Sequence, residues 1–270
     1  MLRDITLGQY YPADSAIHKL DPRVKLFGTL IYIISLFCFK GVVALGVATI
    51  FLFAVIKISK VPFKFMVKGL KAIMVLMLIT AAFNLFLTQG EPMVSFWVLT
   101  ITKEGATNAV LMAIRLTYLI LGTSIMTLTT TPNQLTDGLE KSLMPLSKIG
   151  IPVHAIAMMM SIALRFIPIL IEETDKIMKA QMARGADFES GNLIKKVKSM
   201  IPLLVPLFVS AFRRADDLAM AMEARCYNGG SGRTKMKPLR YNGKDRGAYL
   251  LILLYFAVVL VCRTYFSWPQ

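Results

Sequence analysis

The sequence carries few of the side chains that usually perform catalytic or metal chemistry, and those it has are not grouped. Its two histidines are His18 and His154, and its three cysteines stand far apart without a Cys-x-x-Cys spacing. No His-Glu-x-x-His motif, nucleophile elbow or glycine-rich phosphate loop is present. We therefore expect a protein that is not an enzyme, holds no metal ion or cofactor, and does not bind ATP through a phosphate loop.

Two arginines occupy matching places in the second half of the chain. They lie in the tripeptides Ala183-Arg184-Gly185 and Ala224-Arg225-Cys226, 41 residues apart. Each follows a charged, helix-forming stretch and precedes a break in that pattern. A single arginine there is explained by the negative end of the helix dipole, with glycine as the usual stop residue. A matched pair indicates two equivalent partners, because a planar guanidinium binds carboxylates through two parallel hydrogen bonds.

Methionine is frequent, with 17 in the chain, and several lie in the same region as the two arginines. Methionine is a common filler of protein cores. Its flexible, unbranched side chain also suits a surface that adapts to several partners. We predict such an interface at Met158, Met159, Met160, Met178, Met182, Met220 and Met222.

A polar stretch near the N-terminus forms the third candidate site. Residues 18–25 read His-Lys-Leu-Asp-Pro-Arg-Val-Lys. Asp21 followed by Pro22 predicts the start of a helix, with aspartate as the cap and proline at the first helical position. His18 is then a surface or capping residue. We group His18, Asp21, Pro22 and Arg23 as a candidate N-terminal motif.

Composition predicts a membrane protein. The chain is 56% hydrophobic with a mean hydropathy of +0.60, whereas soluble domains are about 45–50% apolar. Apolar runs close to the roughly 20 residues that span a bilayer occur at 24–39, 42–56, 70–87, 108–130 and 247–265. We therefore predict an all-α, polytopic membrane protein with about five transmembrane helices.

Charges between the runs predict the orientation. The segment 57–71, which follows the second run and includes the start of the third, holds five lysines and no acidic residue, which places it in the cytoplasm. Alternation then places the N-terminus and the region after residue 130 inside, and the C-terminal tail outside. The first 25 residues are polar, so we expect no cleaved signal peptide. The predicted location is the cell (plasma) membrane.

The segment 131–246 is strongly charged but contains two apolar blocks, 151–171 and 200–212. Prolines are expected to break both blocks, and the second block is too short to span a bilayer. Two interpretations remain: a further pair of spans, or helices along the membrane face that project into the cytoplasm. We favour the second. The expected regions are a cytoplasmic segment 1–23, helices 1–4 in 24–130, coupling helices in 131–246, and a last helix with an external tail in 247–270.

With these residues in view, the sequence resembles the transmembrane T components of energy-coupling factor (ECF) transporters. The stretch 18–25 looks like the family's N-terminal signature, and the two Ala-Arg-x tripeptides look like its paired coupling motifs. The resemblance covers essentially the whole chain. Cys226 departs from the Ala-Arg-Gly pattern, which leaves the role of Arg225 intact and puts the glycine-dependent turn in question.

The resemblance implies a non-catalytic subunit of an ATP-driven importer. Such a T component joins two ABC ATPases to one of several membrane-embedded S components that bind vitamins. By the same resemblance, Arg184 and Arg225 each enter one ATPase. The methionine surface would serve the S components that share the subunit.

Three other interpretations compete with this one. A self-sufficient permease or secondary carrier would bind solute itself and show an internal repeat among its spans. A membrane-embedded lipid enzyme would need convergent acids, histidines or a metal site. A binder of nucleic acid or of anionic lipid would account for the net charge of +15. The positive cytoplasmic loops already do so, and we expect the lipid bilayer and no nucleic acid as a partner.

Overall fold

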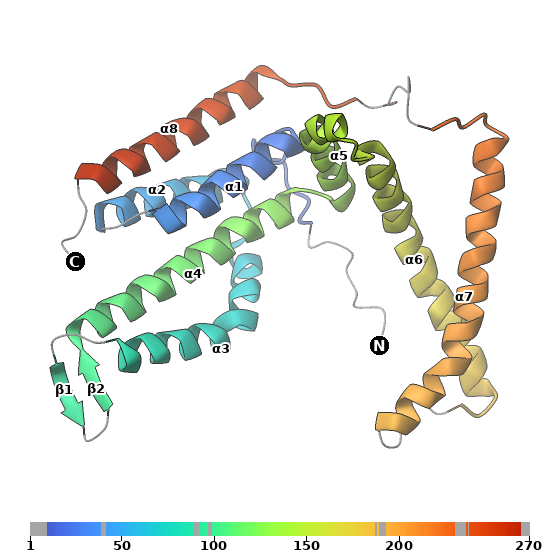
Figure 1. Ribbon diagram of the computed structural model, residues 1–270, viewed down its shortest axis with the longest axis horizontal. Helices are drawn as coiled ribbons and strands as arrows, with labels where there is room; N and C mark the ends of the chain where they lie inside the picture. Colours follow the sequence, from blue (N-terminus) through green and yellow to red (C-terminus); the bar gives the residue numbers. More distant parts are fainter. Residues whose placement is uncertain are drawn as a thin grey trace. The chain divides into compact units, whose positions relative to one another are not determined.

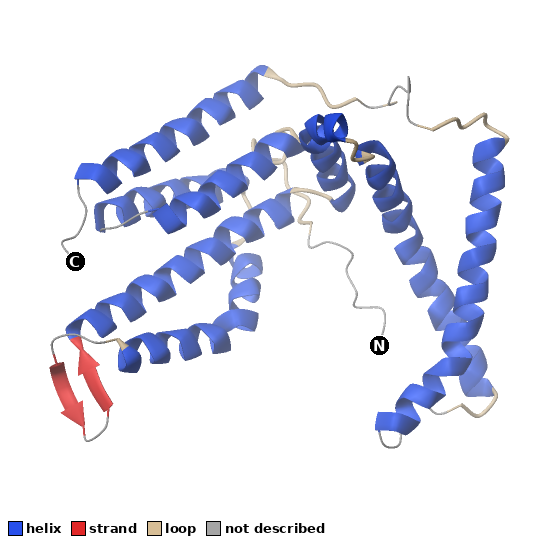
Figure 2. Cartoon of the chain, in the orientation of Figure 1, coloured by secondary structure: helices blue, strands red, loops and turns tan. Residues whose placement is uncertain are grey.

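The computed structural model describes residues 10–38, 42–88, 92–96, 99–186, 188, 193–229, 236 and 238–265. Over these residues the chain is helical apart from one two-stranded hairpin (Figures 1 and 2). It divides into two compact units. Residues 8–138 and 239–270 form what we call the bundle unit, and residues 139–238 form the helix-pair unit. The functional regions expected from the sequence, with boundaries at 131 and 246, stay a prediction.

Five long helices make up the bundle unit, in agreement with the five predicted apolar runs. They are α1 (Pro22–Cys38), α2 (Val42–Ser59), α3 (Phe63–Leu87), α4 (Lys103–Thr129) and α8 (Gly243–Tyr265). The antiparallel strands β1 (Pro92–Phe96) and β2 (Leu99–Thr102) join α3 to α4. No pattern in the sequence had indicated this hairpin. Helix α5 (Pro132–Leu143) begins in the bundle unit and ends in the helix-pair unit.

Length and composition identify the helices that can cross a membrane. Among the described residues, α4, α8 and α6 (Val153–Ala183) are long and apolar enough. Helix α3 qualifies as a fourth if its two segments, which meet at 60°, form one span. Helix α2 is apolar but shorter. The chain is thus a predominantly helical, multi-pass membrane protein, as predicted. Of the five predicted spans, α4 and α8 pass this test, and α3 does so as a bent pair.

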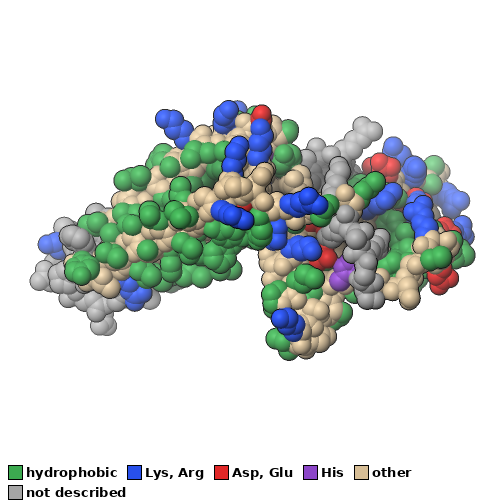
Figure 3. Space-filling model, turned by 90° about the horizontal axis from the view of Figure 1, so that it is seen from above, with side chains coloured by type: hydrophobic (Ala, Val, Ile, Leu, Met, Phe, Trp, Pro, Cys, Tyr) green, Lys and Arg blue, Asp and Glu red, His purple; other side chains and the backbone are tan. Residues whose placement is uncertain are grey.

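The core of the bundle unit packs aromatic rings and small side chains where α1, α2, α4 and α8 meet. The rings of Phe51 and Tyr255 stack with their centroids 4.0 Å apart. The Tyr255 hydroxyl hydrogen-bonds to Ser35 at 2.8 Å, so this buried polar group is satisfied inside the bundle. Apolar side chains remain exposed along the outer faces of these helices (Figure 3). Such surfaces are expected where lipid, rather than water, surrounds the protein.

The helix-pair unit consists mainly of α6 and α7 (Leu193–Glu223), preceded by the 3₁₀ helix η2 (Met144–Ile149). Helix α6 continues through Pro168, and α7 continues through Pro202 and Pro206, so the prediction that prolines break the apolar blocks is wrong at these three positions. The fourth proline, Pro152, lies at the N-cap of α6. A proline removes one hydrogen bond and displaces one carbonyl, but long helix-forming stretches on both sides continue the helix. Because α6 also has the length and composition of a span, its location along the membrane face stays a prediction.

Candidate coupling site and N-terminal motif

The first arginine tripeptide closes the C-terminal end of α6. The amide of Arg184 donates to the Gln181 carbonyl at 3.0 Å, and the amide of Gly185 donates to the Met182 carbonyl at 3.0 Å. The amide of Ala186 reaches back to the Gln181 carbonyl, also at 3.0 Å. Gly185 adopts a left-handed conformation with φ of +88°. Glycine suits this position because it has no Cβ to clash with the backbone.

The second tripeptide closes α7 with the same set of bonds, each shifted by 41 residues. The amides of Arg225 and Tyr227 donate to the Met222 carbonyl at 3.1 and 3.0 Å, and Cys226 donates to the Glu223 carbonyl at 2.8 Å. Cys226 takes the left-handed conformation with φ of +57°. The turn that Cys226 put in question is therefore kept without a glycine, at a cost of about 1–2 kcal/mol.

Both arginines end up in the same setting. Arg184 and Arg225 are exposed, and each immediately precedes the left-handed residue of its turn. Ala183 and Ala224, on the preceding position, are exposed as well. The two tripeptides thus present a cation at the end of a rigid helix, in a backbone geometry that is equivalent at both sites.

Helices α6 and α7 also contact each other at equivalent positions. The Arg214 guanidinium binds the Glu173 carboxylate at 2.8 Å, and these residues are again 41 positions apart. Figure 1 shows that the helices run in opposite directions and cross, so their C-terminal ends lie at opposite ends of the pair. This ion pair was not predicted from the sequence. The repeat spacing of 41 was the available signal, because it relates Glu173 to Arg214.

The side chains of the predicted methionine interface are partly exposed to solvent. Met159, Met160, Met182 and Met220 are exposed, whereas Met158, Met178 and Met222 are half-buried. The exposed members lie among other exposed apolar side chains of α6 and α7, such as Phe208. Among the described residues of the helix-pair unit, the buried apolar side chains are Val153, Ala157 and Leu203. The unit therefore exposes far more apolar surface than it buries.

Both histidines make local contacts. Nδ1 of His18 lies 2.7 Å from the Ser15 hydroxyl, and its Nε2 lies 3.0 Å from the Tyr11 carbonyl. Nδ1 of His154 lies 2.9 Å from the Glu140 carboxylate. His18 therefore connects Ser15 and Tyr11 within the segment before α1, and its ring is half-buried.

Asp21 and Pro22 start α1 as predicted, with Pro22 as its first residue. The Asp21 carboxylate accepts from the Arg23 amide at 2.9 Å and binds the Arg23 guanidinium at 2.8 Å. Burial alone raises the pKa of Asp21, but the hydrogen bonds and charge of Arg23 outweigh it and hold that pKa below its usual value. The Arg23 guanidinium also lies over the Tyr241 ring, 3.7 Å from its centroid.

The N-terminal motif joins three helices of the bundle unit. The Asp21 amide donates to Asp245 Oδ1 at 2.9 Å, at the start of α8. Lys25 Nζ donates to the Thr129 carbonyl at 2.8 Å, at the end of α4, and to the His18 carbonyl at 3.2 Å. Asp245 was not foreseen, because it lies 224 residues from Asp21 and no local pattern relates them.

Fold and site together define a multi-pass membrane protein whose exposed, paired arginines lie on a crossed helix pair. The CbiQ family, described as "Cobalt transport protein", matches residues 13–236. The chain belongs to this family and, within it, to the transmembrane T components of ECF-type ABC importers. These components are non-catalytic coupling subunits.

Three relatives show how far the similarity extends, and each is named "Energy-coupling factor transporter transmembrane protein EcfT". The chain is 57% identical to the protein of Clostridium kluyveri, over 99% of this chain and 98% of the relative. It is 50% identical to that of Thermosediminibacter oceani, over 92% and 94%. It is 44% identical to that of Bacillus subtilis, over 97% and 100%.

Proposed function

We propose that this subunit joins two ABC ATPases to a membrane-embedded S component, and that Arg184 and Arg225 each bind one ATPase. The observation that carries the proposal is the equivalence of the two helix ends. The same three backbone bonds and the same left-handed residue recur 41 positions apart. Two equivalent helix ends suit two equivalent binding sites.

The helix pair is suited to transmitting force between such sites. Each arginine lies just beyond the C-terminal end of a helix of 31 residues, which at 1.5 Å per residue is about 46 Å long. The helices cross at Glu173 and Arg214, so movement of one end relative to the other changes the crossing. ATP can drive transport only if the two nucleotide states of the ATPases bind different arrangements of this pair.

The exposed apolar side chains of α6 and α7 are the proposed surface for the S component. The methionines Met159, Met160 and Met220 are exposed there. Methionine adapts its shape to different partners, so one subunit can serve several S components that carry different vitamins. The proposed orientation places the N-terminus and the helix-pair unit in the cytoplasm and the C-terminal tail outside, in the plasma membrane.

The first test is affinity purification of the chain from its native membranes, with mass spectrometry of the proteins that accompany it. We expect two ATPases and one or more small hydrophobic proteins. Arg184→Ala with Arg225→Ala should remove the ATPases and abolish vitamin uptake. Arg213→Ala is the matched control, because Arg213 is also exposed on α7 but lies away from the helix end.

Two outcomes would contradict the proposal. Normal uptake by the doubly substituted chain would show that the arginines do not couple the ATPases to transport. Purification of the chain alone, together with binding of solute to the isolated chain, would favour a self-sufficient permease instead.

A further inference from the structure

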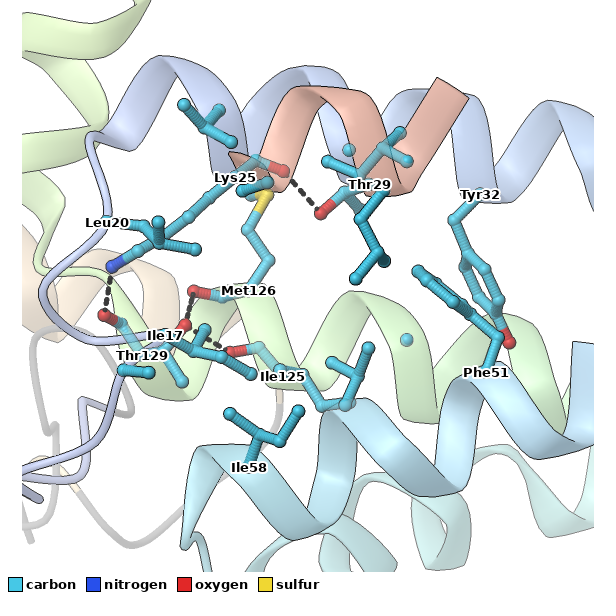
Figure 4. Close-up of a pocket in the computed structure, with 18 of the residues that line it drawn as sticks. Ile17, Leu20, Lys25, Thr29, Tyr32, Phe51, Ile58, Ile125, Met126 and Thr129 are labelled. Carbon is cyan, nitrogen blue, oxygen red and sulfur yellow. Dashed lines mark hydrogen bonds between the residues drawn. The ribbon is translucent and has the colours of Figure 1, made fainter. Parts of the chain in front are cut away.

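The bundle unit contains a cavity of about 410 Å³ that its core packing leaves open. Helices α1, α2, α4 and α8 line it, together with Ala16, Ile17 and Leu20 from the segment before α1. Figure 4 shows Ile125 and Met126 of α4, Ile58 of α2 and Thr29 of α1 lining it. The cavity thus lies directly beside the N-terminal motif.

The lining is apolar except at one end. Among the described residues that line the cavity, the charged side chains are Lys25 and Lys244, and no carboxylate is among them. The apolar walls offer ordered water few partners, because a buried water needs two to four polar groups. A peptide segment would likewise leave its backbone groups without hydrogen bonds. The walls therefore suit a hydrocarbon chain.

Lys25 supplies positive charge at the polar end. Its side chain is buried, and two carbonyl oxygens, of His18 and Thr129, accept two of its three N–H donors. Both acceptors are neutral. The Asp21 carboxylate interacts electrostatically with Lys25, but its ion pair is with Arg23. A buried ammonium is stabilised by a nearby negative charge. Lys244, which is exposed in the first turn of α8, adds a second cation.

The position of the two lysines places this polar end at one face of the membrane. Lys25 lies in the first turn of α1 and Lys244 in the first turn of α8, while Thr129 ends α4. Charge patterning predicts that these three helix ends face the cytoplasm. From Lys25 the lining continues seven residues along α1 to Tyr32, a depth of roughly 10 Å at 1.5 Å per residue.

We propose that this cavity binds an acyl chain of an anionic phospholipid from the cytoplasmic leaflet, with the lipid phosphate at Lys25 and Lys244. The positive charges of Lys25 and Lys244 select an anionic head group, and the apolar walls of the cavity contact the acyl chain. A bound lipid stabilises the junction of α1, α4 and α8, since a ligand that binds only the folded state adds to its stability. The inference does not require the proposed contacts of Arg184 and Arg225.

Native mass spectrometry of the full-length chain, in the complex with which it purifies, tests the proposal. The probes are phosphatidylglycerol and phosphatidylcholine with identical long acyl chains, and dihexanoyl phosphatidylglycerol. We expect one long-chain phosphatidylglycerol to be retained after detergent washing, and the other two lipids to be lost. Lys244→Gln should weaken retention about fivefold, which corresponds to the roughly 1 kcal/mol that one basic residue contributes.

Two further variants separate head-group and chain binding. Ala248→Phe fills part of the cavity from α8 and should abolish retention. Arg246→Gln is the control, because Arg246 is exposed in the same turn as Lys244 but does not line the cavity. Loss of lipid from both charge variants alike would mean that only general positive charge attracts it, and would overturn the proposal.

A photo-reactive amino acid at Leu251, which lines the cavity, identifies the occupant directly. Cross-linking to phosphatidylglycerol in membranes supports the proposal and remains informative if a substituted chain fails to fold. Cross-linking to a partner protein instead, or equal retention of phosphatidylcholine, contradicts it.

Discussion

Some charged side chains are buried and hydrogen-bonded in the bundle unit, whereas the paired arginines of the helix-pair unit are exposed. In the bundle, the buried carboxylates of Asp21 and Asp245 are each hydrogen-bonded within the chain. In the helix pair, Arg184 and Arg225 are exposed at helix ends. Apolar residues follow the same division, since the described part of the helix pair buries few of them while the bundle has a continuous core.

This difference separates structural motifs from interaction motifs. Both candidate sites contain arginine next to a helix end, and both resemble family signatures. Arg23 of the N-terminal motif is bound to Asp21 and packed on Tyr241, so it stabilises the bundle. A polar side chain that is satisfied inside the fold stabilises it, whereas an exposed cation on a rigid helix end is available for binding.

The largest effect on the bundle should come from Gly122→Ala. A Cβ at Gly122 would overlap the ring of Tyr32, which is held by packing against Phe51 and by a hydrogen bond to the Tyr118 carbonyl at 3.2 Å. Overpacking of this kind costs about 3 kcal/mol, which thermal unfolding in detergent measures as a lower Tm. Gly46→Ala is the control, because nothing lies within 4 Å of its Cβ. A Tm unchanged by Gly122→Ala would contradict the packing described here.

Asp245→Ala should have the next largest effect. Its carboxylate accepts from the amides of Asp21 at 2.9 Å and Asn242 at 2.6 Å, so its loss leaves two backbone donors without their partner. We expect a loss of about 2 kcal/mol, again read as a lower Tm. Asp245→Asn keeps one acceptor oxygen and should lose less. If the two variants unfold at the same temperature, the link between α1 and α8 does not stabilise the bundle.

In the helix pair, substitutions at the left-handed residues of the two turns should change the stability of the helix ends in opposite directions. Gly185→Ala places a side chain at φ of +88° and should destabilise the end of α6 by about 1 kcal/mol. Cys226→Gly relieves the same strain at φ of +57° and should stabilise the end of α7 by a similar amount. Hydrogen exchange at residues 181–186 and 222–227 measures both. If Gly185→Ala and Cys226→Gly both stabilise or both destabilise their helix ends, the two turns do not share the same backbone strain.

The smallest effect is expected at the crossing of α6 and α7. A double-mutant cycle with Glu173→Ala and Arg214→Ala should give a coupling energy of about 0.5 kcal/mol, because both side chains are partly exposed and solvent screens the pair. Arg213→Ala with Glu173→Ala is the control and should show no coupling. If the first cycle gives no coupling energy, the ion pair between Glu173 and Arg214 does not hold α6 and α7 together.

Much of the architecture was predictable from local pattern. Apolar runs predicted the five bundle helices, and Asp21 with Pro22 predicted where α1 begins. The repeat spacing predicted that Arg184 and Arg225 occupy equivalent helix ends. These features depend on hydrophobicity, capping and chain spacing, which act over a few residues.

Other features were not predictable because they depend on residues distant in the sequence or on a balance of energies. Asp245 meets Asp21 only after α1 and α8 pack, and the lysines of the cavity come from the same two helices. Prolines were expected to break α6 and α7, yet the long helical stretches around them prevail. The hairpin between α3 and α4 likewise went unforeseen.

The membrane class, the bundle helices and the paired arginines could be predicted from the residues alone, because each follows from composition or short-range spacing. The folded chain was needed to show that Cys226 keeps the turn of Gly185, that Glu173 meets Arg214, and that the N-terminal motif is bound within the bundle. The physical reason is that backbone conformation and partner choice are set by the packing of whole helices, which no single stretch of sequence specifies.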